Sequence, residues 1–191
     1  VNVNAPSQRI RAVLLTALAA ATVLVYSRAL FCDFVYYDDG LYVFDNAAVR
    51  NGITLTGLKQ IFVTGETGTW QPIALLSHML DCQLFGLNAW GHHLSGVLIH
   101  AINSALLCVA LTRMTDRFYP SLAVAAIFAL HPAHVESVAW VSERKDVLST
   151  ALGLLALHAW ASHVRKPAPR GAILAPALYA GSLMAKPMLV S

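Results

Sequence analysis

Long runs of apolar residues, separated by short polar segments, constrain the fold of this chain more than any other feature. The first run, Ala12–Ser27, carries no charged side chain, and with Arg28 near its end it extends to Phe31. A helix of about 20 residues is long enough to cross the hydrocarbon core of a membrane, which is about 30 Å thick. Charged residues make up only 12% of the chain, whereas soluble domains contain about 25%. These features predict an all-α integral membrane protein.

Five runs of this kind predict five crossings within a single membrane domain that takes in residues 1–191. The third run is interrupted by His131-Pro132 and the fifth by Lys186-Pro187, so both crossings should be bent or broken. Because the chain stops within the fifth run, we expect it to be a fragment of a larger membrane protein. The expected crossings lie at about residues 12–31, 94–111, 121–141, 147–164 and 172–190.

The basic residues predict the orientation of these crossings. Asp116 is the only acid on the side that holds the N-terminus, and every other acid falls on the opposite side. The positive-inside rule then places the N-terminus in the cytoplasm and exposes two outer loops, at about residues 32–91 and 131–146. A net charge of +3, with basic residues scattered at the ends of apolar runs, excludes nucleic acid as a partner. The basic residues on the N-terminal side are Arg9, Arg11, Arg113, Arg117, Arg165, Lys166 and Arg170.

The first outer loop is large and contains a predicted helix of its own. Pro72 suits a first helical turn, and Gly86 suits a helix end. Between them, apolar residues recur at the spacing of a helix, while polar residues fall elsewhere around it. We therefore expect an amphipathic helix over Pro72–Phe85 that lies on the membrane surface, and packing against the neighbouring crossings is a compatible alternative. The apolar stripe consists of Ile73, Leu76, Leu80 and Leu84, with Leu75 and Met79 beside it.

Two adjacent acids, Asp38 and Asp39, follow the first crossing closely. Such a pair can act as a general base, stabilise a positively charged transition state or bind a metal. Neighbouring carboxylates also raise one pKa, which suits a base that works near neutral pH. The alternative is an ordinary acidic turn around Gly40. We take Asp38 and Asp39 as the candidate catalytic residues.

A second polar cluster interrupts the third run on the same predicted side as Asp38 and Asp39, and we expect it to face these acids. His131, His134 and Glu136 lie within six residues of one another, and Pro132 must bend the chain if all three are to converge. Their candidate roles are binding a phosphate, general acid catalysis or binding a divalent cation. The alternative is a structural role, in which His131 bonds a helix end and Glu136 is buried against a base. A zinc-protease site is excluded because the HExxH pattern is absent.

Other polar residues near these clusters are weaker candidates. Arg144 and Lys145 can bind a phosphate, or they can pair with the acids beside them in a solvated loop tip. His93 can point at the site, although a packed histidine is the commoner case. Trp70 is typical of a membrane interface, and it can also stack on a sugar or a lipid.

Several of these segments together resemble a known family. They are FVYYDD, then WQPIALLSHMLDCQLFGLNAWGHHLSGVLIHAINSALL, FALHPAHVESVAWVSERKDVLS and the final AKPMLV. The chain from Phe31 onward is similar to the membrane half of TMTC-type, tetratricopeptide-containing glycosyltransferase-like proteins. The HPxHVESVAWV…RKD block is the specific part of this resemblance. Ser95-Gly96 departs from it, since a Thr-Asn-like pair is expected there.

The resemblance implies a fold and an activity. Such proteins resemble the GT-C superfamily, multispanning enzymes that include the protein O-mannosyltransferases and use a polyprenyl-phosphate-linked sugar at the outer face. In that superfamily an essential acid follows the first crossing, an interfacial helix lies in the first loop, and an acidic or histidine-bearing loop follows the third span. These features correspond to Asp38/Asp39, Pro72–Phe85 and His131–Glu136. The family has more crossings than this chain, and tetratricopeptide repeats follow them.

The leading hypothesis is transfer of a mannose-like sugar from a polyprenyl phosphate to a protein or another acceptor. A second hypothesis is a non-catalytic membrane anchor for a tetratricopeptide domain. A third is transport or handling of a metal by the HPxHxE cluster. The resemblance favours a bacterial inner membrane, with the endoplasmic reticulum as the alternative. No cofactor is certain beyond a candidate divalent cation, and membrane lipids are expected neighbours.

Overall fold

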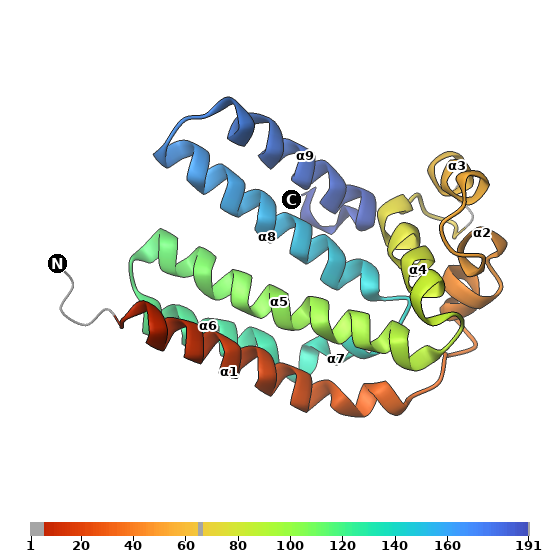
Figure 1. Ribbon diagram of the computed structural model, residues 1–191, viewed down its shortest axis with the longest axis horizontal. Coiled ribbons are helices and arrows are strands. Elements are labelled where there is room, and N and C mark those ends of the chain that lie inside the picture. Colours follow the sequence, from red (N-terminus) through yellow and green to blue (C-terminus); the bar gives the residue numbers. More distant parts are fainter. Residues whose placement is uncertain (1–5, 65–66, 191) are drawn as a thin grey trace.

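The computed structural model describes residues 6–64 and 67–190, and within these ranges all regular structure is helical. The longer helices lie side by side along the long axis of the molecule, and the shortest ones gather at one end (Figure 1). A 3-10 turn at Ser27–Phe31 extends the first helix, and a π-helical turn spans Gly40–Phe44. The helices are α1 (Gln8–Tyr26), α2 (Ala47–Arg50), α3 (Leu55–Val63), α4 (Pro72–Phe85), α5 (Ala89–Thr115), α6 (Phe118–Leu130), α7 (Val135–Ala139), α8 (Arg144–Arg165) and α9 (Pro169–Ala185).

Three helical segments are long and apolar enough to cross a membrane, namely Gln8–Phe31, Ala89–Thr115 and Arg144–Arg165. A fourth crossing is formed if the broken pair Phe118–Leu130 and Pro132–Ala139, bent by 50°, is a single span. Helix α9 lies where a fifth crossing is expected, but with 17 residues it falls outside this set of described helices.

The break between α6 and α7 follows directly from the His131-Pro132 sequence. A residue before proline avoids the α-helical region, and His131 is extended, with a ψ angle of 131°. Its ring nitrogen Nδ1 accepts a hydrogen bond from the Ala133 backbone N–H at 3.1 Å, which caps the short turn that follows. The sequence therefore ends one helix and starts the next at this point.

Polar side chains join the long helices to one another. Asn103 of α5 donates to the Val147 carbonyl of α8 at 2.7 Å, and a His100 ring nitrogen lies 3.1 Å from the Ala129 carbonyl of α6. The Ser149 hydroxyl of α8 lies 3.0 Å from that of Ser182 in α9. Such bonds orient helices in a membrane, where lipid removes the hydrophobic drive for helix association.

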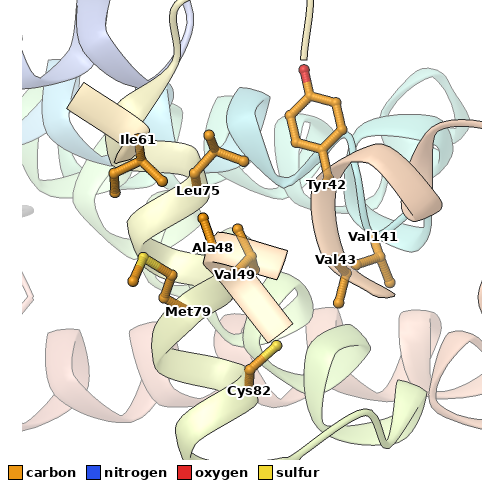
Figure 2. Close-up of a cluster of buried hydrophobic side chains, with 9 residues drawn as sticks. All are labelled: Tyr42, Val43, Ala48, Val49, Ile61, Leu75, Met79, Cys82 and Val141. Carbon is orange, nitrogen blue, oxygen red and sulfur yellow. The ribbon is translucent and has the colours of Figure 1, made fainter. Parts of the chain in front are cut away.

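The first outer loop folds into a small helical cap with a core of its own (Figure 2). Helix α4 has the predicted bounds and contacts α2, α3 and α5. Its buried face differs from the predicted apolar stripe, since Leu80 and Leu84 are exposed whereas His78 and Asp81 are buried. The position of α4 on a membrane surface stays a prediction. The core consists of Tyr42, Val43, Ala48, Val49, Ile61, Leu75, Met79, Cys82 and Val141.

The antiparallel order of the long helices gives the bundle two different ends (Figure 1). One end holds the cap and the polar residues that precede α8. The other holds the start of α1, the connection between α5 and α6, and the connection between α8 and α9. The basic residues identified in the sequence lie in or beside these segments, so they gather at the end opposite the cap.

Candidate active site

The side chain of Asp39 joins the two outer loops. It lies at the start of the π-helical turn and is fully buried. Its Oδ2 accepts a hydrogen bond from the Val35 backbone N–H at 2.8 Å, and its Oδ1 accepts one from the Ser142 backbone N–H at 2.9 Å. Asp39 therefore fixes the segment after α1 to the segment before α8.

Asp38 lies in a different environment. Its side chain is half-buried, and it makes no hydrogen bond or ion pair within residues 6–64 and 67–190. The two acids thus have different environments: two backbone N–H groups hold the Asp39 carboxylate, whereas the Asp38 carboxylate has no partner among the described residues.

The histidine–glutamate cluster is not joined to these acids. His131 and Glu136 are exposed, and within the described residues neither they nor His134 makes a hydrogen bond or ion pair with Asp38 or Asp39. The second outer loop instead meets Asp39 through the backbone of Ser142. The break at Pro132 explains this arrangement, because the His131 ring caps its own turn.

His134 packs against aromatic rings of the bundle. Its ring centroid lies 4.6 Å from that of Phe128 and 5.6 Å from that of His100. No group of three or more His, Cys, Asp or Glu side chains within the described ranges is arranged to hold a metal ion. His131, His134 and Glu136 therefore do not form such a group, and a metal-handling role for them stays a prediction.

Arg144 forms a buried ion pair with Asp81 of the cap. The Arg144 side chain is 1% exposed, and its guanidinium contacts the Asp81 carboxylate directly. It also donates to the carbonyl oxygens of His92 and Ser77, the latter at 3.5 Å. A buried charge needs a partner of opposite sign, so this guanidinium is committed to holding α4 against α5 and α8. Arg144 is not positioned to bind a donor phosphate, contrary to the sequence-based expectation.

Lys145 belongs to a second charged network beside the first. Its Nζ lies 2.7 Å from Glu143 Oε1 and 4.6 Å from the centre of the Tyr42 ring. The Tyr42 hydroxyl in turn donates to Gln71 Oε1 at 2.8 Å. Lys145 thus pairs with the adjacent Glu143, as the alternative interpretation predicted, but it is buried rather than part of a solvated loop tip, so that part of the prediction is wrong.

Glu143 is the centre of this network. Its second oxygen lies 3.2 Å from Nζ of Lys186, which also pairs with Asp146. Burial alone would raise the pKa of Glu143, but hydrogen bonds and charges from Lys145 and Lys186 lower it below the ordinary value. The acid therefore stays ionised and joins the start of α8 to the end of α9.

Two buried histidines near the cap were not predicted well from the sequence: His78 was not a candidate, and His93 was only a weak one. His78 of α4 is fully buried, and its ring stacks on that of His92 at 6.2 Å. Burial, followed by the positive charge of Arg144, lowers the pKa of His78 well below its ordinary value. His93 is also buried. A signal was available, since His78 lies on the same helical face as Leu75, Met79 and Cys82.

Trp70 is half exposed and lies in the loop before α4. Its indole N–H donates to the Phe62 carbonyl at 3.0 Å, which connects this loop to the end of α3. This contact gives Trp70 a structural role in the cap.

A groove of about 670 Å³ opens beside the Asp39 segment. It is bounded by residues 30–36 on one side and by residues 87–90 at the start of α5 on the other. Its lining combines aromatic rings with a carboxylate and an amide: Tyr36, Phe44, Trp90, Asp33 and Asn88. Such a combination suits a ligand with both apolar and hydrogen-bonding groups.

Comparison with curated proteins identifies relatives of the chain. It is 32% identical over 167 residues to protein O-mannosyl-transferase TMTC1 of Mus musculus, a match that covers 80% of the chain. It is 29% identical over 157 residues to Tmtc1 of Drosophila melanogaster, covering 78% of the chain. It is also 27% identical over 170 residues to TMTC3 of Homo sapiens, covering 84%.

The chain is related to the TMTC protein O-mannosyl-transferases.

The chain spans about 18% of the length of these TMTC relatives. No family model matches it, and no solved structure does. The TMTC relationship and the candidate spans fit an integral membrane protein, and the printed names of the relatives are those of transferases. The catalytic roles of individual residues and the reaction of this chain are proposals.

Proposed function

We propose that this chain forms the acceptor-side part of a glycosyltransferase with a GT-C-like fold. The enzyme transfers a mannose-like sugar from a polyprenyl phosphate to a protein hydroxyl at the extracytoplasmic face. The observation that carries the proposal is the buried Asp39, bonded to backbone from both outer loops, beside the half-buried Asp38 and an open groove. The names of the relatives support the reaction class.

The reaction needs a base for the acceptor hydroxyl. The hydroxyl oxygen attacks the anomeric carbon, the bond from that carbon to the phosphate oxygen breaks, and polyprenyl phosphate leaves with the electron pair. The hydroxyl proton goes to Asp38, whose carboxylate has no competing partner among the described side chains. Asp39 positions Asp38. Both oxygens of Asp39 accept backbone N–H groups, from Val35 and Ser142, and these bonds fix the backbone next to Asp38.

The phosphate of the sugar-carrying lipid needs a neighbouring cation or hydrogen-bond donor. Arg144 and Lys145 are committed to Asp81 and Glu143, which leaves His131 and His134 as the donor-side candidates in this chain. The N–H of a neutral imidazole can donate a hydrogen bond to an oxygen of the departing phosphate and so stabilise its negative charge. Glu136 is exposed beside them, where its carboxylate can orient an imidazole.

The proposed orientation places the N-terminus in the cytoplasm and the cap outside. It follows from the collection of basic residues at the end of the bundle opposite the cap. A bacterial inner membrane stays a prediction of the sequence.

Replacing the two acids tests this function in the full-length protein. We expect Asp38→Asn to lower sugar transfer by about 100-fold or more, the usual effect of removing a general base, with no change in thermal stability. Asp39→Asn should lower both transfer and stability, because its amide nitrogen cannot accept the second backbone N–H. Transfer is measured as mannose incorporated into an acceptor peptide from a lipid-linked donor. Wild-type transfer by both variants would remove the case for these acids.

A non-catalytic anchor is the second candidate function. It is favoured by the mutual pairing of Asp81 with Arg144 and of Glu143 with Lys145 and Lys186, which are contacts of a structural kind. An anchor predicts that Asp38→Asn is silent, while substitutions of the buried pairs impair assembly. Measurements of sugar transfer and of thermal stability therefore separate the two candidate functions.

A further inference from the structure

Two hollows at the basic end of the bundle share one residue, Arg113. The first is an apolar groove of about 660 Å³ with walls from α1, α5 and α8. The second is a pocket of about 270 Å³ lined by Arg113, Arg165 and Lys166, with Ala161 and Ser162. Helix α5 contacts both α1 and α8, and it lies between them in Figure 1. A cationic pocket and an apolar groove thus adjoin at Arg113.

We infer that these hollows together bind one anionic phospholipid, with its phosphate in the cationic pocket and one acyl chain in the groove. The inference is independent of the proposed sugar transfer, because it concerns the end of the bundle away from the cap.

The groove has the chemistry and the length of an acyl-chain site. Small and aliphatic side chains make up most of its lining, including Ala20, Ala105 and Val109. From Arg113 to Leu98 it follows α5 for about 22 Å, at 1.5 Å per residue. One leaflet of the hydrocarbon core is about 15 Å deep, so the groove can take a chain that spans its leaflet.

Besides Arg113, two polar side chains line the groove, Thr16 and His158, and the ring of His158 is already satisfied. One ring nitrogen of His158 lies 3.0 Å from the Leu106 carbonyl, and the other accepts from the Arg113 guanidinium at 3.3 Å. The groove therefore presents little unpaired polarity to a chain lying in it.

Hydrogen bonds orient Arg113 and Arg165 in the pocket, and both guanidinium groups keep further N–H donors for a ligand. The Arg165 guanidinium donates to the Arg113 carbonyl, and Arg113 donates to His158. A guanidinium carries five N–H donors, so each of these arginines retains several for a phosphate, which arginine binds in a bidentate manner. No acid lines the pocket among the described residues, and Asp116 lies beyond Arg113 at the end of α5.

The shared Arg113, which places the two hollows side by side, favours a lipid over a soluble anion. Free phosphate would use the pocket alone, whereas a phospholipid gains from both the charge and the apolar groove. Basic pockets between membrane helices at the cytoplasmic side are suited to anionic lipid headgroups, and the proposed orientation places this end in the cytoplasm.

Lipid selection by the full-length protein tests the inference. The protein is placed in nanodiscs of phosphatidylcholine with a minority of phosphatidylglycerol, and retained lipid is identified by native mass spectrometry. We expect selective retention of phosphatidylglycerol, weakened about fivefold for each cation removed and about 25-fold in the double variant Arg113→Gln/Arg165→Gln. Arg117→Gln/Arg170→Gln removes the same charge at the same end outside the pocket, and it should retain the lipid.

Equal losses in the two double variants would show general surface attraction and overturn the inference. Displacement of the lipid by excess inorganic phosphate would also overturn it, because the pocket would then act without the groove. Ala20→Phe, which fills the groove from α1, should lower lipid retention without altering the cations.

A photo-cross-linking residue at position 20 identifies what lies in the groove. A lipid adduct, lost in Arg113→Gln/Arg165→Gln, supports the inference. A cross-link to another segment of the protein, such as a helix outside this chain, would show that protein fills the groove and would overturn it.

Discussion

At the scale of single residues, the cap end of the bundle is stabilised by buried charges that have specific partners. Asp39 accepts two backbone N–H groups, and Arg144 pairs with Asp81. Because both sites are almost inaccessible to water, their electrostatic interactions are little screened. Removing one partner leaves an uncompensated buried charge, which costs far more than the pair itself contributes.

The Arg144–Asp81 pair gives a prediction at this scale. Arg144→Met should destabilise the protein by about 3–5 kcal/mol, because Asp81 is left buried without its cation. Asp81→Leu should have a comparable effect, and the double variant should recover most of the stability. Thermal unfolding in detergent measures all three, with exposed Glu136→Gln as the neutral control. Losses that simply add in the double variant would contradict the pairing.

At the scale of elements, the cap is a set of short helices that hold together by close packing. Gly57 lies where α3 approaches its neighbours. A β-carbon built there would lie 2.7 Å from the Ala48 carbonyl oxygen and 3.0 Å from Met79 Cε. The glycine therefore permits a contact between α3, α2 and α4 that no larger residue allows.

Gly57→Ala tests this contact. We expect a loss of about 1–3 kcal/mol, typical of overpacking, although alanine favours a helix more than glycine does. The matched control is Gly181→Ala in α9, where the added carbon meets only Leu152 Cδ1 at 3.5 Å, so this variant should be neutral or stabilising. Unfolding in detergent, together with limited proteolysis of the cap, measures both. Equal stability of the two variants would contradict the packing argument.

At the scale of the whole molecule, the bundle separates two chemistries. The cap end collects most of the acids, several buried histidines and the mixed groove, and the opposite end collects the arginine-lined pocket and the apolar groove. This separation along one axis is what a fixed orientation across a membrane requires.

The native cysteines report this orientation. Cys32 is exposed at the cap end, whereas Cys82 and Cys108 are buried. A membrane-impermeant maleimide added outside intact cells or right-side-out vesicles should therefore label Cys32 and spare the other two, as read by peptide mass spectrometry. In a Cys32→Ser background, Arg117→Cys should be labelled only after permeabilisation. Labelling of Arg117→Cys in sealed vesicles would place the basic end outside.

The sequence by itself determined the helical character of the chain, the α4 bounds and the break at His131-Pro132. These features depend on local rules: apolar length, proline geometry and glycine ends. The TMTC relationship was also readable, because its motifs are contiguous in the chain. The five crossings, the orientation and the catalytic role of the acids remain predictions.

Only the tertiary structure decided which polar residues meet. Asp39 bonds to Ser142 rather than facing His134, and Arg144 takes its partner from Asp81, on a helix far away in sequence. From the sequence alone, any charged residue is a candidate to bind a ligand. Once its side chain is buried, it needs a partner of opposite charge, and the tertiary packing determines which residue that is. That choice depends on long-range packing between helices, which spacing along a chain does not specify.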